Sequence, residues 1–352
     1  MARTGSPRHS GVGPVSLRVL SIAYPFAKVG LNAAGGAEQI LALLDRGLTA
    51  RGHRSIVIAA ERSQVRGDLI ALPADPRETE HTHARWRDAI AQTLRTHEID
   101  ILHFHGLDFH HYLPPGGPPA LVTLHLPPSF YPAEVFSMAR PRTWFNCVSQ
   151  SQLSACPDSP LLSGWIGNGV PLDLYSPGKL DNYVLAMGRI CPEKGFHLAL
   201  DAAEQAGAPL YLAGKLYPYP DHVRYWKEVL RPRLRPPHKF LGVATIADKP
   251  RFLASARCLL VPSLVAETSS LVAMEAMASG TPVVAFPAGA LSELVHPGEN
   301  GFLVHNAAEM AAAIPKAGSI DRAACRRLAQ SAFSAETMVD RYIELFHKLI
   351  AL

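Results

Sequence analysis

The chain has 352 residues, of which 48% are hydrophobic, and its 34 basic and 30 acidic residues leave a net charge of +4. This length exceeds what one hydrophobic core usually serves, so we expect two domains. The small, dispersed positive charge gives no ground for a nucleic-acid partner, and no apolar run reaches the roughly 18 residues of a membrane span. Peripheral contact with a membrane surface stays open.

The N-terminal segment 1–16 is rich in Gly, Pro, Ser and Arg and lacks the apolar centre of a secretory signal, which predicts a disordered tail. The five cysteines are scattered without any C-x-x-C pair. That usage is typical of reduced thiols. Both features favour a cytoplasmic protein.

Strands alternate with helices in the first half of the chain, which we delimit as a domain of residues 17–172. Runs rich in β-formers predict strands at 17–23, 55–60, 101–104, 120–124 and 144–148. Apolar residues at helical spacing predict helices at 37–48 and 83–97. The alternation predicts a parallel sheet covered by helices.

The same alternation restarts after a Gly- and Pro-containing linker at 168–179 and predicts a second domain, 173–334. Its expected strands are 183–187, 210–212, 240–243, 258–262 and 282–286, and its expected helices are 196–205, 270–278, 307–314 and 321–332. The last segment, 335–352, predicts an amphipathic helix that could cross back to the first domain. The fold class is therefore α/β, with two Rossmann-like domains facing across a cleft. Ligands of such sheets bind at the carboxyl ends of the strands.

The most informative segment is a strand followed by Glu267 and then by a helix that contains Glu275. Glu267 would lie in the loop before the helix, and Glu275 roughly 8 Å further along at 1.5 Å per residue. The helix N-terminus between them is an anion site, because its N–H groups are unpaired and its dipole is positive. Ser269 or Ser270 could cap the same helix. Glu275 stands among apolar residues, where a carboxylate needs a partner.

A second segment, from Gly188 to Gly195, places Arg189 and Lys194 on one loop after a strand. Both side chains could bind a diphosphate. No two aspartates are spaced as D-x-D, the arrangement that holds a divalent cation on a pyrophosphate in metal-dependent transferases. We therefore expect no metal in the donor site.

In the first half, Gly35 and Gly36 open a helix where the backbone could approach a phosphate closely. His105 and His125 each follow a strand, so both lie at the carboxyl edge of the sheet. A histidine there is more often a hydrogen-bonded wall residue than a catalyst, and a metal site built from the nearby histidines is disfavoured by their irregular spacing.

Together these segments resemble the retaining glycosyltransferases of family 4, which have the GT-B fold. The resemblance spans nearly all of the chain after the tail. The matching segments are Gly35-Gly36-Ala37-Glu38, Thr123-Leu124-His125, Val148-Ser149-Gln150-Ser151, Gly167-Asn168-Gly169-Val170, Gly188-Arg189 through Lys194-Gly195, Glu267 to Glu275 with the following Ala276-Met277-Ala278-Ser279-Gly280-Thr281-Pro282, and Asn300-Gly301-Phe302-Leu303-Val304.

The resemblance implies a role for each matching residue. Arg189 and Lys194 would bind the donor diphosphate, Glu267 the hydroxyls of the transferred sugar, and Glu275 the ribose. His125 would lie against the sugar near its reacting carbon, so the catalytic candidates are His125 and Glu267. The further donor-binding candidates are Gly35, Gly36, Gly214, Gly242, Ser269, Ser270, Leu271 and Val272, and the acceptor-side candidates are Tyr24 and His105. This chain departs from the family at Ser269-Ser270, where Phe-Gly is usual.

The expected enzyme is a retaining, metal-independent hexosyl-type glycosyltransferase of class EC 2.4 without a cofactor. Its donor would be a nucleotide sugar, a UDP-sugar rather than a GDP-sugar, and its acceptor a small molecule, a glycan or a natural product. Three alternatives stay open: a phosphorylase or epimerase on the same fold, a non-catalytic nucleotide-sugar-binding protein, and an NAD-dependent oxidoreductase, for which the G-x-G-x-x-G fingerprint is missing.

Overall fold

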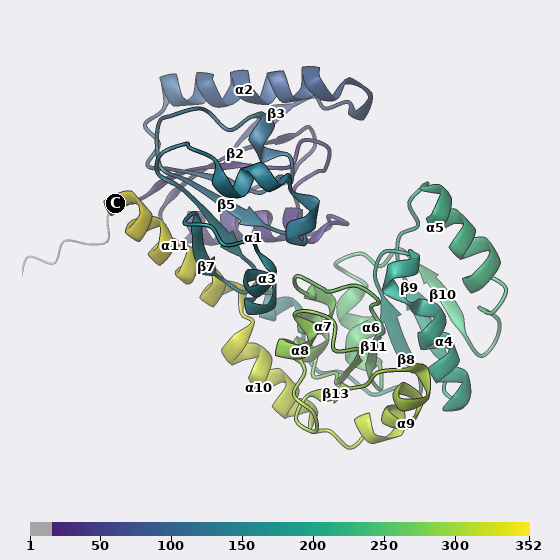
Figure 1. The fold of residues 1–352 in the computed structure, drawn as a ribbon. Helices are drawn as coiled ribbons and strands as arrows, with labels where there is room; N and C mark the ends of the chain where they lie inside the picture. The colour runs from purple at the N-terminus through teal and green to yellow at the C-terminus, as the bar shows by residue number, and fades with distance from the viewer. Residues whose placement is uncertain (1–15) are drawn as a thin grey trace, which may run out of the picture.

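Residues 16–352 form two α/β domains in the computed structural model, each built on a parallel sheet with helices on both faces (Figure 1). The tail predicted for residues 1–16 lies outside the described residues except for Ser16, whose hydroxyl donates to the carbonyl of Gly52 at 2.8 Å. The helices described here include none that combines the length and the apolar content required to cross a membrane.

The sheet of the first domain has seven strands in the order β3-β2-β1-β4-β5-β6-β7, all paired in parallel. The strands are β1 (Arg18–Ile22), β2 (Arg54–Ala60), β3 (Asp68–Leu72), β4 (Ile101–Phe104), β5 (Ala120–Leu124), β6 (Thr143–Cys147) and β7 (Leu162–Trp165). The central strands are fully buried and largely apolar, as parallel sheets require, with His103 in β4 and Thr123 in β5 as buried polar residues. The two edge strands, β3 and β7, are partly exposed and carry no continuous apolar run, and the sequence pattern did not predict them.

The first sheet is covered by helices α1 (Gly36–Ala50), α2 (Thr79–Thr96) and α3 (Gln150–Ala155). Trp86 and Ile90 of α2 are buried on one face, together with Phe104 and Phe145 of the strands. Helix α1 covers the opposite face and contributes Leu44 among others. Because both faces of the sheet are packed in this way, the carboxyl ends of the strands, where the loops leave the sheet, are held rigidly.

The second sheet has six parallel strands in the order β10-β9-β8-β11-β12-β13. The strands are β8 (Val184–Met187), β9 (Leu210–Ala213), β10 (Lys239–Gly242), β11 (Leu259–Val261), β12 (Val283–Ala285) and β13 (Gly301–Leu303). The surrounding helices are α4 (Phe196–Gln205), α5 (Pro220–Arg224), which continues into a π-helical turn at Tyr225–Leu230, α6 (Lys249–Ser255), α7 (Leu271–Ala278), α8 (Leu291–Leu294), α9 (Ala307–Ala317) and α10 (Arg322–Ala332).

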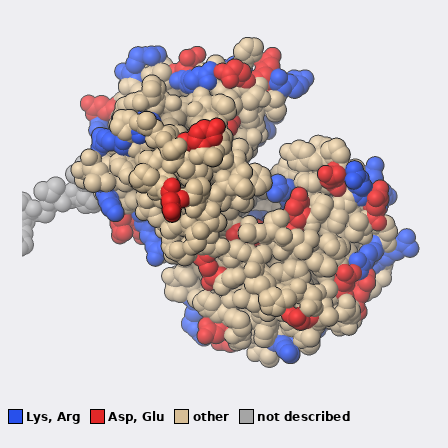
Figure 2. All heavy atoms as spheres, viewed as in Figure 1, with Lys and Arg blue, Asp and Glu red and all other residues tan. Residues whose placement is uncertain are grey.

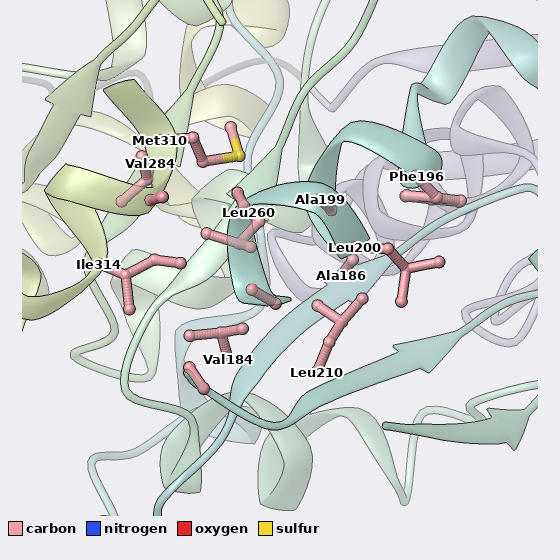
Figure 3. Close-up of a cluster of buried hydrophobic side chains, with 14 of the residues drawn as sticks. Val184, Ala186, Phe196, Ala199, Leu200, Leu210, Leu260, Val284, Met310 and Ile314 are labelled. Carbon is pink, nitrogen blue, oxygen red and sulfur yellow. The ribbon is translucent and has the colours of Figure 1, made fainter. Parts of the chain in front are cut away.

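One face of the second sheet packs against α4 and α9, where Phe196, Leu200, Met310 and Ile314 interdigitate with strand residues such as Leu260 (Figure 3). The other face packs against α6, α7 and α10. Helix α7 is apolar almost all round and is nearly enclosed. Its rigid burial matters because its N-terminus faces the other domain.

The last helix, α11 (Ala335–Ala351), returns to the first domain and packs against α1 (Figure 1). Its apolar face buries Val339, Tyr342 and Phe346 against the first sheet. This face follows the 3.6-residue period read from the sequence. The chain therefore passes between the two domains twice.

Replacing Phe346 with alanine should strongly destabilise the first domain, because the ring is fully buried between α11 and the sheet. We expect a loss of about 3–5 kcal/mol, measured by urea denaturation. Glu344→Ala, at an exposed position of the same helix, is the control and should change stability by less than about 0.5 kcal/mol. Equal effects of the two changes would show that α11 is not packed as described.

Candidate functional site

A cavity of about 350 Å³ lies between the domains and is lined by residues of both. Figure 2 shows from one side the notch that separates the two domains. The lining residues are Tyr24, Gly35, Gly36, Ala37, Glu38, His105, Leu107, His125, Leu126, Tyr131, Asn168, Arg189, Thr268, Ser269 and Leu271. Most of them directly follow the carboxyl ends of β1, β4, β5, β8 and β11, or open the next helix, so the site lies where parallel sheets bind ligands.

Two helix N-termini converge on this cavity, one from each domain. Helix α1 begins at Gly36 and α7 begins at Leu271, and both residues line the cavity. They are close together, because a Cβ atom added at Gly36 would lie 3.3 Å from Leu271 Cδ1. Neither helix has a side-chain cap on its first N–H groups. Apart from the Glu38 N–H, which the Glu38 carboxyl already engages, the wall therefore carries N–H donors without side-chain caps and the positive ends of two helix dipoles.

The capping role considered for the serines before α7 is wrong. Ser270 occupies the N-cap position but its side chain makes no cap hydrogen bond. The Oγ atom of Ser269 is buried without a hydrogen-bond partner, and so is Oδ1 of Asn168 on the facing wall. Buried polar atoms are rarely left without a partner in native proteins. Both residues line the cavity, so a polar ligand there would satisfy them.

Arg189 follows β8 on an exposed part of the cavity wall and makes no ion pair with any residue in 16–352. Lys194 lies on the same loop, but its Nζ is held at 2.6 Å by Oε1 of Glu267. The loop is anchored by Gly195, whose φ of +63° is left-handed and whose Cβ position is filled by the carbonyl oxygen of Pro262. Of the two basic residues expected to act together, only Arg189 has an uncommitted charge.

Glu267 is held from three directions. Its Oε1 accepts from Ser263 Oγ at 2.6 Å as well as from Lys194. Its backbone pairs with the segment around Gly289, where the Glu267 carbonyl accepts from Ala290 N at 2.8 Å. Gly289 has a φ of +60°, and any side chain there would collide with the Glu267 backbone. The carboxylate is thus fixed at the end of β11.

Glu275 is only 4% exposed and is paired with Lys249, which the sequence analysis did not single out. The Lys249 Nζ lies 2.8 Å from Oε1 and 3.1 Å from Oε2. Lys249, the first residue of α6, is therefore the partner that the apolar surroundings of Glu275 require. Burial and the neighbouring Glu275 carboxylate also raise the pKa of Tyr175 above its ordinary value. A single lysine at the start of a short helix gives no periodic signal by which the sequence could have revealed it.

Burial shifts the pKa of several groups on the first-domain wall toward the neutral form. Burial lowers the pKa of His125 to about 3 and lowers that of His105 well below its ordinary value. Burial also raises the pKa of the Tyr24 hydroxyl and of the Glu38 carboxyl. Across the cleft, Thr268 Oγ1 donates to the His125 carbonyl at 2.9 Å, which ties this wall to the loop between Glu267 and α7.

The cavity brings together eight of the residues expected from the sequence: Tyr24, Gly35, Gly36, His105, His125, Arg189, Ser269 and Leu271. The remaining candidates lie outside its lining: Lys194, Gly214, Gly242, Glu267, Ser270, Val272 and Glu275. Gly214 and Gly242 join the carboxyl ends of β9 and β10 through a 2.8 Å backbone hydrogen bond. Glu38 and Asn168 also line the cavity, and the sequence motifs that contain them did not predict this position.

One group of side chains could hold a metal ion among residues 16–352, namely Cys191, Glu193 and His222, whose ligand atoms lie within 4.8 Å of one another. The Nδ1 atom of His222 is buried without a partner. The Cys191 thiol and the Glu193 carboxylate already interact with each other and with the charge of Arg189. Burial raises the pKa of the Cys191 thiol, which disfavours the thiolate form that binds a metal ion.

Two protein-family models match this chain, one in each domain. A model of the glycosyl transferases group 1 matches residues 181–317, and a model of glycosyltransferase family 4 matches residues 34–154. The chain belongs to the family 4 glycosyltransferases. The first match covers the second domain from β8 to α9, and the other covers the first domain from just before α1 to α3.

Curated relatives of this family 4 glycosyltransferase include the D-inositol 3-phosphate glycosyltransferase of Mycobacterium leprae (strain Br4923), 33% identical over 217 residues that cover 52% of this chain and 48% of the relative. The enzyme of the same name from Mycobacterium tuberculosis (strain ATCC 25177 / H37Ra) is 32% identical over 217 residues, covering 52% and 43%. The chain thus spans about half the length of the curated relatives it matches.

Solved structures resemble this family 4 glycosyltransferase over nearly its full length. The sucrose-phosphate synthase of Thermosynechococcus elongatus has a TM-score of 0.77 at 20% identity, covering 95% of this chain and 99% of that one. AviGT4, a glycosyltransferase involved in avilamycin A biosynthesis, has a TM-score of 0.73 at 23% identity, covering 95% and 98%. These similarities confirm the expected GT-B fold of two facing α/β domains.

Lys249→Met should destabilise the second domain, because the Glu275 carboxylate would be left buried without its cation. Removing one partner of a buried pair costs about 3–5 kcal/mol, and the measurement is urea denaturation at neutral pH. The double variant Lys249→Met, Glu275→Gln should recover part of the loss. Lys316→Met, at an exposed lysine that forms no ion pair with residues 16–352, is the matched control. A Lys249→Met protein as stable as the control would contradict the pairing.

Proposed function

We propose that this chain transfers a glycosyl group from a nucleoside diphosphate sugar to an acceptor hydroxyl, with retention of anomeric configuration and without a metal ion. The observation that carries the proposal is the convergence of the α1 and α7 N-termini with the uncommitted charge of Arg189 on one cavity. An anionic group with several oxygens is the ligand that such a wall would bind best.

In the proposed complex the diphosphate lies at these N-termini, with Arg189 on one side and Lys194 on the other. Lys194 would share its charge between the phosphate and Glu267, which orients the hydroxyls of the transferred sugar. Glu275, held by Lys249, would bind the ribose, and Gly214 and Gly242 would let the nucleoside lie close to the strand ends. The backbone from Ser269 to Val272 would donate to phosphate and sugar oxygens.

Uracil is the base we propose. The structure of Anabaena Alr3699/HepE in complex with UDP and glucose has a TM-score of 0.75 to this chain at 21% identity. The acceptor would enter from the first domain, where Tyr24, Glu38 and His105 line the cavity. Three polar side chains in a small cavity suit a hydroxylated small molecule or the end of a glycan or natural product.

The reaction follows from the charges. The bond from the anomeric carbon to the phosphate oxygen breaks, the bond from that carbon to the acceptor oxygen forms on the same face, and the acceptor proton passes to the departing phosphate. Negative charge grows on the diphosphate, where Arg189 and the two helix N-termini would stabilise it. Glu267, already paired with Lys194, has a positioning role rather than that of a nucleophile.

Binding of UDP tests the donor site directly. Arg189→Ala should weaken UDP about 10- to 100-fold in titration calorimetry, since a hydrogen bond to a charged group contributes about 1.5–3 kcal/mol. Uridine, which lacks phosphates, should not distinguish the variant from the wild type. Arg231→Ala, at an exposed arginine of the second domain without an ion pair, is the control. Equal UDP affinity in the folded Arg189→Ala variant would remove this arginine from the site, and a wild-type protein that binds neither UDP nor other nucleoside diphosphates would refute the proposed donor.

Turnover should persist in excess chelator, because Arg189 and Lys194 would occupy the electrostatic role that a divalent cation has in metal-dependent transferases. The assay incubates a nucleotide sugar and an accepted hydroxyl compound with and without EDTA, and nuclear magnetic resonance of the product reads its anomeric configuration. Activity that disappears with EDTA and returns with Mg²⁺ or Mn²⁺ would contradict metal independence, and an inverted product would contradict retention. Formation of sugar 1-phosphate from a glycoside and inorganic phosphate, with no turnover of nucleotide sugars, would indicate a phosphorylase.

A further inference from the structure

A continuous chain of buried hydrogen bonds runs from the cavity to the returning helix α11. It begins at His125, whose Nε2 lies 2.9 Å from His105 Nδ1, and continues from His105 Nε2 to His103 Nδ1 at 3.2 Å. His103 Nε2 lies 2.8 Å from Thr123 Oγ1, which lies 3.1 Å from the hydroxyl of Tyr342 on α11. The chain thus joins the ends of β4 and β5 to the last helix.

The groups at the Tyr342 end of this series of hydrogen bonds determine which group donates to which. The side-chain amide of Asn146 donates from Nδ2 to the Cys147 carbonyl at 2.8 Å, and a carbonyl oxygen can only accept. This contact identifies the amide nitrogen, and its second hydrogen points to the Tyr342 hydroxyl at 3.2 Å. Tyr342 therefore accepts from Asn146 and has its own proton left to donate. The acceptor available to that proton is Thr123 Oγ1.

The donor in each of the remaining hydrogen bonds follows from the one before it. Thr123 accepts from Tyr342 and donates its own proton to His103 Nε2. A neutral imidazole that accepts at one nitrogen carries its proton on the other, so His103 donates from Nδ1 to His105 Nε2. His105 in turn donates from Nδ1 to His125 Nε2. Both ring nitrogens of His103 and His105 have partners, which also fixes the orientation of the two rings.

The opposite direction would leave a buried donor without an acceptor. If His125 donated inward, Thr123 would accept from His103, and the hydroxyl of either Thr123 or Tyr342 would have no acceptor for its proton among the described residues. Tyr342 is fully buried, and an unsatisfied buried donor is costly. All three rings must also be neutral for the chain to have one direction. Burial lowers the pKa of both His103 and His125 to about 3, which keeps them neutral near pH 7.

We propose that Asn146 and Tyr342 are positioning residues that hold His125 in one tautomer, with the proton on Nδ1 and the N–H available to the cavity. His125 Nδ1 makes no hydrogen bond with any residue in 16–352, and His125 lines the cavity. The ring is therefore a hydrogen-bond donor to an oxygen of the ligand and not a base that could accept the acceptor's proton. The catalytic meaning of this assignment rests on the proposed function, whereas the tautomer itself does not.

The tautomer can be read in the free protein. Nitrogen-15 labelling of the histidines distinguishes protonated from unprotonated ring nitrogens, and the His125→Asn variant assigns the signals of His125. We expect a neutral His125 with its proton on Nδ1 at neutral pH. A proton on Nε2, or a cationic ring, would overturn the proposal.

Tyr342→Phe removes the hydroxyl at the origin of the chain while it retains the ring. The Nδ1 signal of His125 should then shift toward the unprotonated value as the second tautomer becomes populated. Thr123→Val, which interrupts the chain in its middle, should give the same shift and serves if Tyr342→Phe does not fold. Phe346→Leu is the matched control, because Phe346 packs against His103 without joining the chain, and it should leave the signal unchanged. An unchanged signal in both Tyr342→Phe and Thr123→Val would overturn the proposal.

Kinetics provide the functional half of the test. Because the Nδ1–H group would contact the transferred sugar, Tyr342→Phe should lower kcat about 3- to 10-fold, the value of one hydrogen bond, while the Kd for UDP stays within about twofold. A loss that appears equally in Phe346→Leu would overturn the positioning role. A wild-type protein with the expected tautomer but no sugar transfer would refute the proposed function and leave the assignment of His125 intact, so the two failures are distinguishable.

Discussion

The constraint on which this site depends is the common direction of the strands in each parallel sheet. Parallel strands release all their carboxyl ends at one edge, and the two sheets turn these edges toward the same cavity. Residues that are far apart in the chain, such as Tyr24, His125 and Arg189, meet there for that reason. The helices that follow β1 and β11 begin at this cavity. The positive N-terminal ends of α1 and α7 therefore lie close together, although the two helices are far apart in the sequence.

Two acidic groups of the second domain, outside the cavity lining, are each paired with a lysine. Lys194 contacts Glu267, and Lys249 contacts Glu275. A carboxylate removed from water requires such a partner, and the pairing holds both carboxylates in place. An anionic ligand that reached Lys194 would share this lysine with Glu267, so that the Glu267 carboxylate is not left without a cation. The arrangement thus favours ligands that bring oxygen anions to the loop between Gly188 and Gly195.

Much of the fold and part of the candidate site could be predicted from the sequence, and there are physical reasons why the remaining elements and contacts could not. The fold and the segments around Glu267 and Glu275 follow from apolar periodicity and from a carboxylate among apolar residues. The edge strand β3 was missed because a half-exposed edge needs no apolar run. Lys249 was missed because the need of Glu275 for a partner does not say where that partner lies in the chain. The contact of Asn146 with Tyr342 joins residues 196 positions apart, and only the return of α11 brings them together.

The two walls of the cavity differ in charge in a way that suits the proposed reaction. The wall of the second domain carries the charge of Arg189 and the N-terminus of α7, which would face the diphosphate where negative charge develops. On the wall of the first domain, burial lowers the pKa of His125 to about 3 and so keeps its ring neutral. A neutral ring beside the sugar would not repel the positive charge that develops there. In this arrangement the series of hydrogen bonds behind His125 keeps the Nδ1–H group of His125 available to the cavity as a donor, and it adds no charge to the cavity.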